Sequence, residues 1–128
     1  MITINDLHKQ FKTKTGSVQA VAGVGFTAAD GQITGLLGPN GAGKSTTMKT
    51  IAGLISPMGG SIFFNGENIT GLPASQITKK GISFVSEELN LFVNMTVQEN
   101  LYMGAYIIKD KKVQNERLDF VFSLFPRL

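Results

Sequence analysis

The stretch GLLGPNGAGKSTTMKTIAG, residues 35–53, decides the interpretation of the chain, because it predicts three kinds of structure in one run. Its first residues continue an apolar segment that predicts a short buried strand over 33–37. A glycine-rich turn follows. From Lys44 onward, apolar residues recur at helical spacing until Gly53, which fits a C-terminal cap. The sequence therefore predicts a strand, a tight turn and a helix in succession.

The turn matches the pattern G-x-x-x-x-G-K-[ST], which is typical of a phosphate-binding P-loop. The matching residues are Gly38, Pro39, Asn40, Gly41, Ala42, Gly43, Lys44 and Ser45. Glycines let backbone N–H groups approach phosphate oxygens, and the start of the helix adds the positive end of its dipole. Lys44 suits the β- and γ-phosphates, the Ser45 hydroxyl suits Mg²⁺, and Thr46 would lie close to the α-phosphate. The pattern predicts nucleotide binding without deciding between ATP and GTP, or between an ATPase and a kinase.

The segment before the turn predicts an antiparallel sheet. Residues 2–7 alternate as a strand does, residues 12–17 are polar and predict a hairpin loop, and residues 18–29 contain a second alternating run. With the strand predicted over 33–37, three strands joined by short loops precede any helix.

Five further elements are predicted downstream of the turn. They are strands over 61–65 and 82–86 and helices over 73–80, about 97–107 and 113–125. The start of the fourth element is the best defined, because Thr96 and Glu99 have the spacing of a capping box.

Composition excludes several functional classes. The 128 residues suit about one domain, and their net charge of +3 is not gathered into the basic, aromatic-rich patch that nucleic-acid binders use. The absence of cysteine excludes disulfides and cysteine metal sites. No signal-peptide pattern opens the sequence and no apolar run is long enough to span a bilayer, so we expect no membrane insertion by this chain itself.

Beyond these motifs, the chain resembles the ATPase subunits of ABC transporters over essentially its whole length. The resemblance lies in VQAVAGVGFTAADGQITGLLGPNGAGKST and in the later GGSIFFNGENITGLPASQITKKGISFVSEE. The segments NMTVQENLYMGAY and FSLFPRL are most similar to the branched-chain amino acid importers of that family. The resemblance implies a truncated α/β P-loop NTPase core with an N-terminal antiparallel β-subdomain and the start of a helical subdomain. It assigns residues 1–86 to the β-subdomain and P-loop core, and residues 87–128 to a Q-loop-like segment and partial helical subdomain.

The resemblance also implies roles for three residues outside the P-loop. Phe11 occupies the place of an aromatic that stacks on adenine, and Val18 the place of a lateral contact to the base. For both, core packing is the alternative. Glu87 falls where many members carry the glutamine that meets Mg²⁺ or the attacking water, and a carboxylate is a stronger magnesium ligand than an amide. The alternative for Glu87 is a solvent-exposed residue at the end of a strand, without a functional role. Ser45 and Glu87 are thus the predicted metal ligands, and Glu87 is the one candidate catalytic residue.

The family implies ATP and Mg²⁺ as ligands, and transmembrane permease subunits and a second ATPase subunit as partners. It implies a cytoplasmic location, peripheral on the inner face of the membrane. The sequence has no LSGGQ-type signature, no acidic strand ending in Asp-Glu and no switch histidine. We therefore expect the ATP-binding N-terminal portion of a subunit that energises uptake, with branched-chain amino acids as the implied substrate, and little hydrolysis by this chain alone.

Two alternatives remain at this stage. One is a non-hydrolysing interaction fragment that acts through residues 87–105. The other is a small P-loop kinase with Glu87 as its acidic partner, for which only Arg117 and Arg127 could clamp the transferred phosphoryl group. The last helix would expose several apolar side chains, so self-association of the isolated chain is a further expectation.

Overall fold

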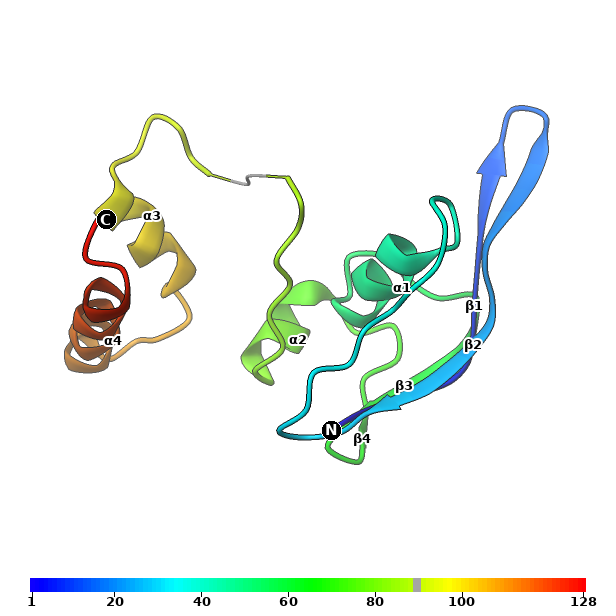
Figure 1. The fold of residues 1–128 in the computed structure, drawn as a ribbon, viewed down its shortest axis with the longest axis horizontal. Coiled ribbons are helices and arrows are strands. Elements are labelled where there is room, and N and C mark those ends of the chain that lie inside the picture. The colour runs from blue at the N-terminus through cyan, green and yellow to red at the C-terminus, as the bar shows by residue number, and fades with distance from the viewer. Residues whose placement is uncertain (89–90) are drawn as a thin grey trace. The chain divides into compact units, whose positions relative to one another are not determined.

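The computed structural model describes residues 1–88 and 91–128 and divides into two compact units, Met1–Val85 and Ser86–Leu128 (Figure 1). Residues 89–90, part of the predicted Q-loop-like segment, lie outside the described residues. The roles that the sequence assigns to residues 1–86 and 87–128 stay predictions.

A four-stranded antiparallel sheet in the order β2-β1-β3-β4 builds the first unit. Its strands are β1 (Ile2–Thr13), β2 (Gly16–Ala28), β3 (Gly59–Phe64) and β4 (Glu67–Asn68). The polar hairpin loop predicted between the first two strands is confirmed, although it is tighter than expected, with only Lys14 and Thr15 between β1 and β2. The predicted N-terminal antiparallel β-subdomain is therefore present.

The strands predicted over 33–37 and 82–86 are absent from the structure. β3 takes the place in the sheet that residues 33–37 were expected to fill, and neither segment pairs with any strand in the described part of the chain. The prediction that residues 33–37 are buried is also wrong, because Ile33 and Leu37 are fully exposed. The physical reason is that a strand needs a neighbouring backbone, and no described residue supplies one beside these segments.

Two helices complete the first unit, α1 (Lys44–Ile51) and α2 (Ala74–Lys79). Gly53 follows α1 with a φ of 70°, the left-handed conformation that a C-terminal glycine cap requires, so that prediction is confirmed. One apolar cluster ties the sheet to both helices. It comprises Ile4, Leu7, Val21, Ile51, Ile62, Ile69 and Ile77. This cluster is the core that holds α1, and with it the glycine-rich turn, against the sheet.

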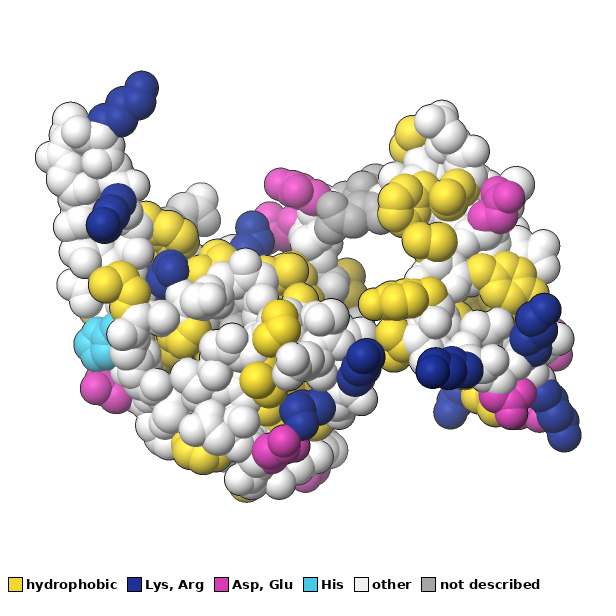
Figure 2. Space-filling model, turned by 180° about the vertical axis from the view of Figure 1, so that it is seen from behind, with side chains coloured by type: hydrophobic (Ala, Val, Ile, Leu, Met, Phe, Trp, Pro, Cys, Tyr) yellow, Lys and Arg dark blue, Asp and Glu magenta, His cyan; other side chains and the backbone are white. Residues whose placement is uncertain are grey.

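The second unit consists of α3 (Val97–Gly104) and α4 (Lys111–Leu124). The predicted capping box is confirmed, because Glu99 N donates to Thr96 Oγ1 at 3.2 Å while Thr96 N donates to Glu99 Oε2 at 2.7 Å. Leu118 is buried, whereas Phe120 and Leu124 are more than half exposed. Hydrophobic side chains are visible on the surface of both units (Figure 2). Within the described residues, no helix is long and apolar enough to cross a membrane.

The capping box predicts a pH dependence of the start of α3. The backbone N–H of Thr96, followed by its hydroxyl, donates to the Glu99 carboxylate, and these bonds hold the pKa of Glu99 below its ordinary value of 4.5. A carboxyl group whose pKa is lower in the folded state than in the unfolded state stabilises the fold at pH values above its unfolded pKa. This stabilisation is lost as the pH falls through the pKa of the folded state. We expect the Thr96 amide proton shift to change below pH 4.5 in NMR spectra. Glu99→Gln should remove this change, and an unchanged pH profile in that variant would contradict the assignment.

Candidate functional site

The glycine-rich turn forms a compact loop at the start of α1. Ala42 N donates to Pro39 O at 3.2 Å inside the loop, and Thr47 N donates to Gly43 O at 2.8 Å as the first bond of the helix. Gly41 and Gly43 both have a φ of 84°. This left-handed conformation suits glycine, so the backbone needs glycine at both positions.

The electrostatics of the loop favour an anion. Gly43 is the N-cap of α1 and offers no side-chain cap, and the first turn of the helix contains no acidic residue. The first N–H groups of a helix lack partners within it, and they carry the positive end of its dipole. A Cβ built on Gly41 would meet nothing within 4 Å, so the space beside the loop is open there. The loop therefore fits a phosphate group.

Lys44 folds its ammonium group back across the loop. Its Nζ donates to Gly38 O at 2.9 Å and to Pro39 O at 3.0 Å. Both acceptors are neutral, and no ion pair of Lys44 with a carboxylate is found among the described residues. The loop thus holds an uncompensated positive charge beside the open helix end.

Strand β2 supports the loop from behind. A Cβ on Gly43 would lie 2.2 Å from the carbonyl oxygen of Ala20, which is closer than any two such atoms can approach. Ala20 is the extra residue of a β-bulge, because Lys9 pairs with Val21 whereas Gln10 pairs with Gln19. The contact between Gly43 and Ala20 therefore sets the position of the P-loop on the sheet.

The two residues predicted to contact the base lie together on the β1–β2 hairpin. Phe11 and Val18 are direct partners in the ladder, and their side chains are 40% and 56% exposed. Val18 precedes Ala20 by two residues, about 7 Å along a strand. Lys9 Nζ lies 5.2 Å from the centroid of the Phe11 ring, within cation–π range. The structure thus places this pair near the strand that supports the P-loop, and its role stays a prediction.

The remaining predicted residues divide between the two units. Ser45 is exposed and Thr46 half-buried, both in the first turn of α1. Glu87 is exposed and belongs to the second unit, so the pairing of Ser45 with Glu87 on one metal ion also stays a prediction. Among the described residues, no group of three or more acidic or histidine side chains is placed to hold a metal ion.

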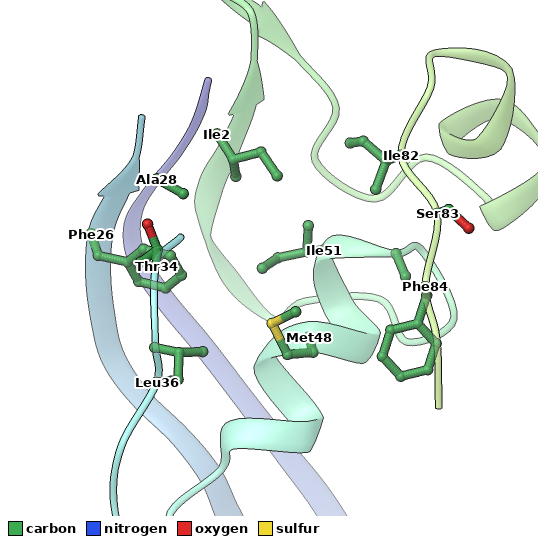
Figure 3. Close-up of a pocket in the computed structure, with 11 residues that line it drawn as sticks. Ile2, Phe26, Ala28, Thr34, Leu36, Met48, Ile51, Ile82, Ser83 and Phe84 are labelled. Atoms are coloured by element: carbon green, nitrogen blue, oxygen red, sulfur yellow. The ribbon is translucent and has the colours of Figure 1, made fainter. Parts of the chain in front are cut away.

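Sequence reasoning missed an apolar pocket of about 150 Å³ in the first unit (Figure 3). Its lining includes Thr34, Leu36, Met48, Ile51, Ile82 and Phe84. The short apolar run ITGLL and the strand-like segment ISFVS were the available signals, but they predicted strands instead of a pocket wall. The lining is mainly apolar and includes no residue of the loop at 38–46, so this pocket is distinct from the candidate phosphate site.

Comparison with known proteins decides the family. The profile of the family described as ABC transporter matches residues 21–126. The chain belongs to the ABC transporter family. This confirms the membership predicted from the sequence.

Curated relatives of this ABC chain include two branched-chain amino acid transport ATP-binding proteins. BraG of Pseudomonas aeruginosa is 42% identical over 116 residues, which cover 91% of this chain and 49% of BraG. LivF of Archaeoglobus fulgidus, described as a probable transport protein of this kind, is 45% identical over 96 residues, which cover 75% of this chain and 40% of LivF. The chain thus spans about half the length of these relatives.

A solved structure supports the fold. The ATP-binding cassette MJ0796, in a dimeric post-hydrolysis state bound to ADP and Pi, aligns with a TM-score of 0.78 at 23% identity. The alignment covers 91% of this chain and 53% of that one. Together with the family match, this likeness confirms the α/β P-loop NTPase fold class.

A matched pair of glycine substitutions tests the contact that positions the loop. Gly41→Ala and Gly43→Ala both place a Cβ at a φ of 84°, which costs about 1–2 kcal/mol in each case. Only Gly43→Ala also forces a Cβ against the Ala20 carbonyl. We expect urea unfolding, followed by circular dichroism, to show a clearly larger loss of stability for Gly43→Ala. Equal losses in the two variants would mean that β2 does not support the loop.

Proposed function

We propose that this chain is the ATP-binding N-terminal portion of an ABC transporter ATPase subunit that energises uptake across a membrane. The observation that carries the proposal is the loop at 38–46, where an uncapped helix start and the uncompensated charge of Lys44 lie beside open space. BraG and LivF are named for branched-chain amino acid transport, so these amino acids are the substrate class proposed for the whole transporter.

Phosphate binding would use charges that the loop already presents. The N–H groups at the start of α1 would donate to phosphate oxygens. The Lys44 ammonium would leave the carbonyls of Gly38 and Pro39 for the β- and γ-phosphates. The ammonium would there gain the Coulomb attraction of an opposite charge, which the neutral carbonyls lack, so this exchange of partners favours the bound state. The two carbonyls belong to exposed residues and would be hydrated in turn.

Adenine would be held on the β1–β2 hairpin. One face of the Phe11 ring carries Lys9, so the base would stack on the opposite face, with Val18 beside it. Stacking of a base on an aromatic side chain contributes about 1–3 kcal/mol. The exposure of both side chains supports this role over core packing.

Mg²⁺ would be held by the Ser45 hydroxyl and the Glu87 carboxylate, together with phosphate oxygens and water, as this ion prefers. When bound, it would neutralise the charge that develops on the phosphates. The part of this chain would be to bind and orient the nucleotide. Glu87 is also the one acidic group here that we propose for contact with the attacking water.

The second unit supports a role in partner binding. Leu91, Phe92 and Val93 are exposed. The Asn100 side chain holds Phe92, accepting from its N at 2.9 Å and donating to its O at 3.1 Å, and also donates to Met95 O at 3.3 Å and Thr96 O at 3.0 Å. This ordered apolar surface suits a membrane permease subunit, which would place the assembled protein at the cytoplasmic face of the membrane. It also favours a second candidate function, an interaction fragment that binds the permease without hydrolysis. No observation in the described residues favours the kinase alternative.

Nucleotide binding can be tested by thermal unfolding with and without Mg·ATP. Ligand at a hundred times its dissociation constant adds about 2.7 kcal/mol, equivalent to roughly 10 °C for a chain of 128 residues. Lys44→Ala should abolish this shift. Lys49→Ala removes an exposed lysine from the last turn of the same helix and should keep it. An equal shift in the parent chain and in Lys44→Ala would refute the assignment of the P-loop.

A further inference from the structure

The far half of the β1–β2 hairpin has no described strand beside it on the β3 side. Pairing between β1 and β3 ends at His8 and Gly59, whereas the ladder between β1 and β2 continues to the end of β1. Figure 1 shows this part of the hairpin extending past the rest of the sheet. A ribbon of two strands is only marginally stable in water by itself. Phe11 and Val18, the predicted base contacts, therefore lie where the sheet has only two strands.

Lys9 ties this two-stranded part of the hairpin to the segment that follows α1. It is the first residue of β1 beyond the pairing with β3, and it is half-buried. Its Nζ donates to Ser56 O at 2.7 Å. Met58 N donates to His8 O at 2.9 Å in the same region. The Lys9 side chain thus extends the attachment of β1 by one residue beyond the last backbone bond.

The same ammonium group covers one face of the Phe11 ring. Lys9 Nζ lies 5.2 Å from the ring centroid, and the two residues lie on one face of the sheet because they are two positions apart in β1. Lys9 forms no ion pair with a carboxylate within the described part of the chain. Its charge is therefore directed to a ring and to the carbonyl of Ser56, and the ring is linked through it to a segment outside the hairpin.

Lys9 also lies beside the contact that positions the P-loop. It pairs with Val21, the neighbour of the bulged residue Ala20, whose carbonyl contacts Gly43 at the start of α1. The hairpin is thus attached to both ends of α1, through Gly43 before the helix and through Ser56 after it. Binding to side chains that are already fixed avoids the entropy cost of ordering them. This arrangement suits a ligand that contacts the hairpin and the loop together.

We propose that Lys9 is a positioning residue for the base of the nucleotide and acts through Phe11. Its ammonium group holds the ring from the face opposite the base and fixes the hairpin to Ser56. The free face of the ring then meets the base while the P-loop binds the phosphates. This inference rests on the proposed function, and it adds to that site a residue that contacts no atom of the nucleotide.

Lys9→Met tests this role, because methionine keeps an unbranched side chain but has neither the charge nor a hydrogen-bond donor. Calorimetric titration with Mg·ATP and, separately, with magnesium triphosphate distinguishes binding of the base from binding of the phosphates. We expect Lys9→Met to raise the dissociation constant for Mg·ATP about three- to tenfold, because a cation–π contact and a hydrogen bond are lost. The dissociation constant for magnesium triphosphate should not change, because that ligand has no base.

Three further variants show whether the effect passes through Phe11. Lys12→Met removes the same charge from an exposed position on the opposite face of β1 and should leave Mg·ATP binding unchanged. Lys9→Arg should restore most of the affinity, because a guanidinium group also stacks on aromatic rings and donates hydrogen bonds. In the Phe11→Leu background, Lys9→Met should change the dissociation constant for Mg·ATP less than about twofold, because two residues that act as one unit are not additive.

A measurement without nucleotide tests the contact itself. In NMR spectra of the ligand-free chain, the Phe11 ring protons should shift in Lys9→Met and stay unchanged in Lys12→Met. Circular dichroism of each variant would show that it is folded.

Three results would overturn the proposal. The first is an equal effect of Lys9→Met and Lys12→Met on Mg·ATP binding. The second is an equal loss of Mg·ATP and magnesium triphosphate binding in Lys9→Met, which would indicate a general effect on charge or folding. The third is an unchanged set of Phe11 ring signals in ligand-free Lys9→Met. Failure of the parent chain to bind Mg·ATP would refute the proposed function together with this inference, whereas Mg·ATP binding that survives Lys9→Met would refute this inference alone.

Discussion

The position of the P-loop depends on one close contact, between Gly43 and the carbonyl of Ala20. Two features of the sequence make it possible. Gly43 has no Cβ, and the bulge at Ala20 adds an extra residue to β2 where the loop arrives. The hairpin that contains this bulge also contains Phe11 and Val18. The β1–β2 hairpin therefore supports the phosphate loop through Ala20 and also presents the two predicted base contacts.

A second constraint is backbone pairing. The antiparallel sheet forms completely within the first unit because all of its strands are present, and its central strand β1 pairs on both sides. Residues 33–37 and 82–85 have the composition of buried strands, but no described strand pairs with them. Their exposed isoleucine, leucine and valine side chains are apolar area that the fold would bury if a neighbouring backbone were supplied. The first unit thus combines a fully paired antiparallel sheet with two strand-like segments that no described strand pairs with, and α1 packs beside both.

Sequence patterns predicted the elements that are fixed by local chemistry. Examples are the helix after Lys44 with its cap at Gly53, and the capping box of Thr96 and Glu99. The family and fold class followed from the P-loop and its flanks. The patterns failed at residues 33–37 and 82–86, because a short strand-like run shows that a segment can pair but not whether a partner is present. The bulge at Ala20 and the pairing of Phe11 with Val18 depend on the hairpin register, for which the sequence gives no short-range signal.

The function proposed here requires that the loop at 38–46 bind the phosphates of a nucleotide whose base lies on the hairpin. The most direct test is an NMR titration of the ¹⁵N-labelled chain with Mg·ATP and, separately, with magnesium triphosphate. We expect both ligands to shift the amide signals of Gly41, Lys44 and Ser45, whereas only ATP should shift those of Phe11 and Val18. A titration in which ATP leaves the loop amides unchanged would contradict the proposed function.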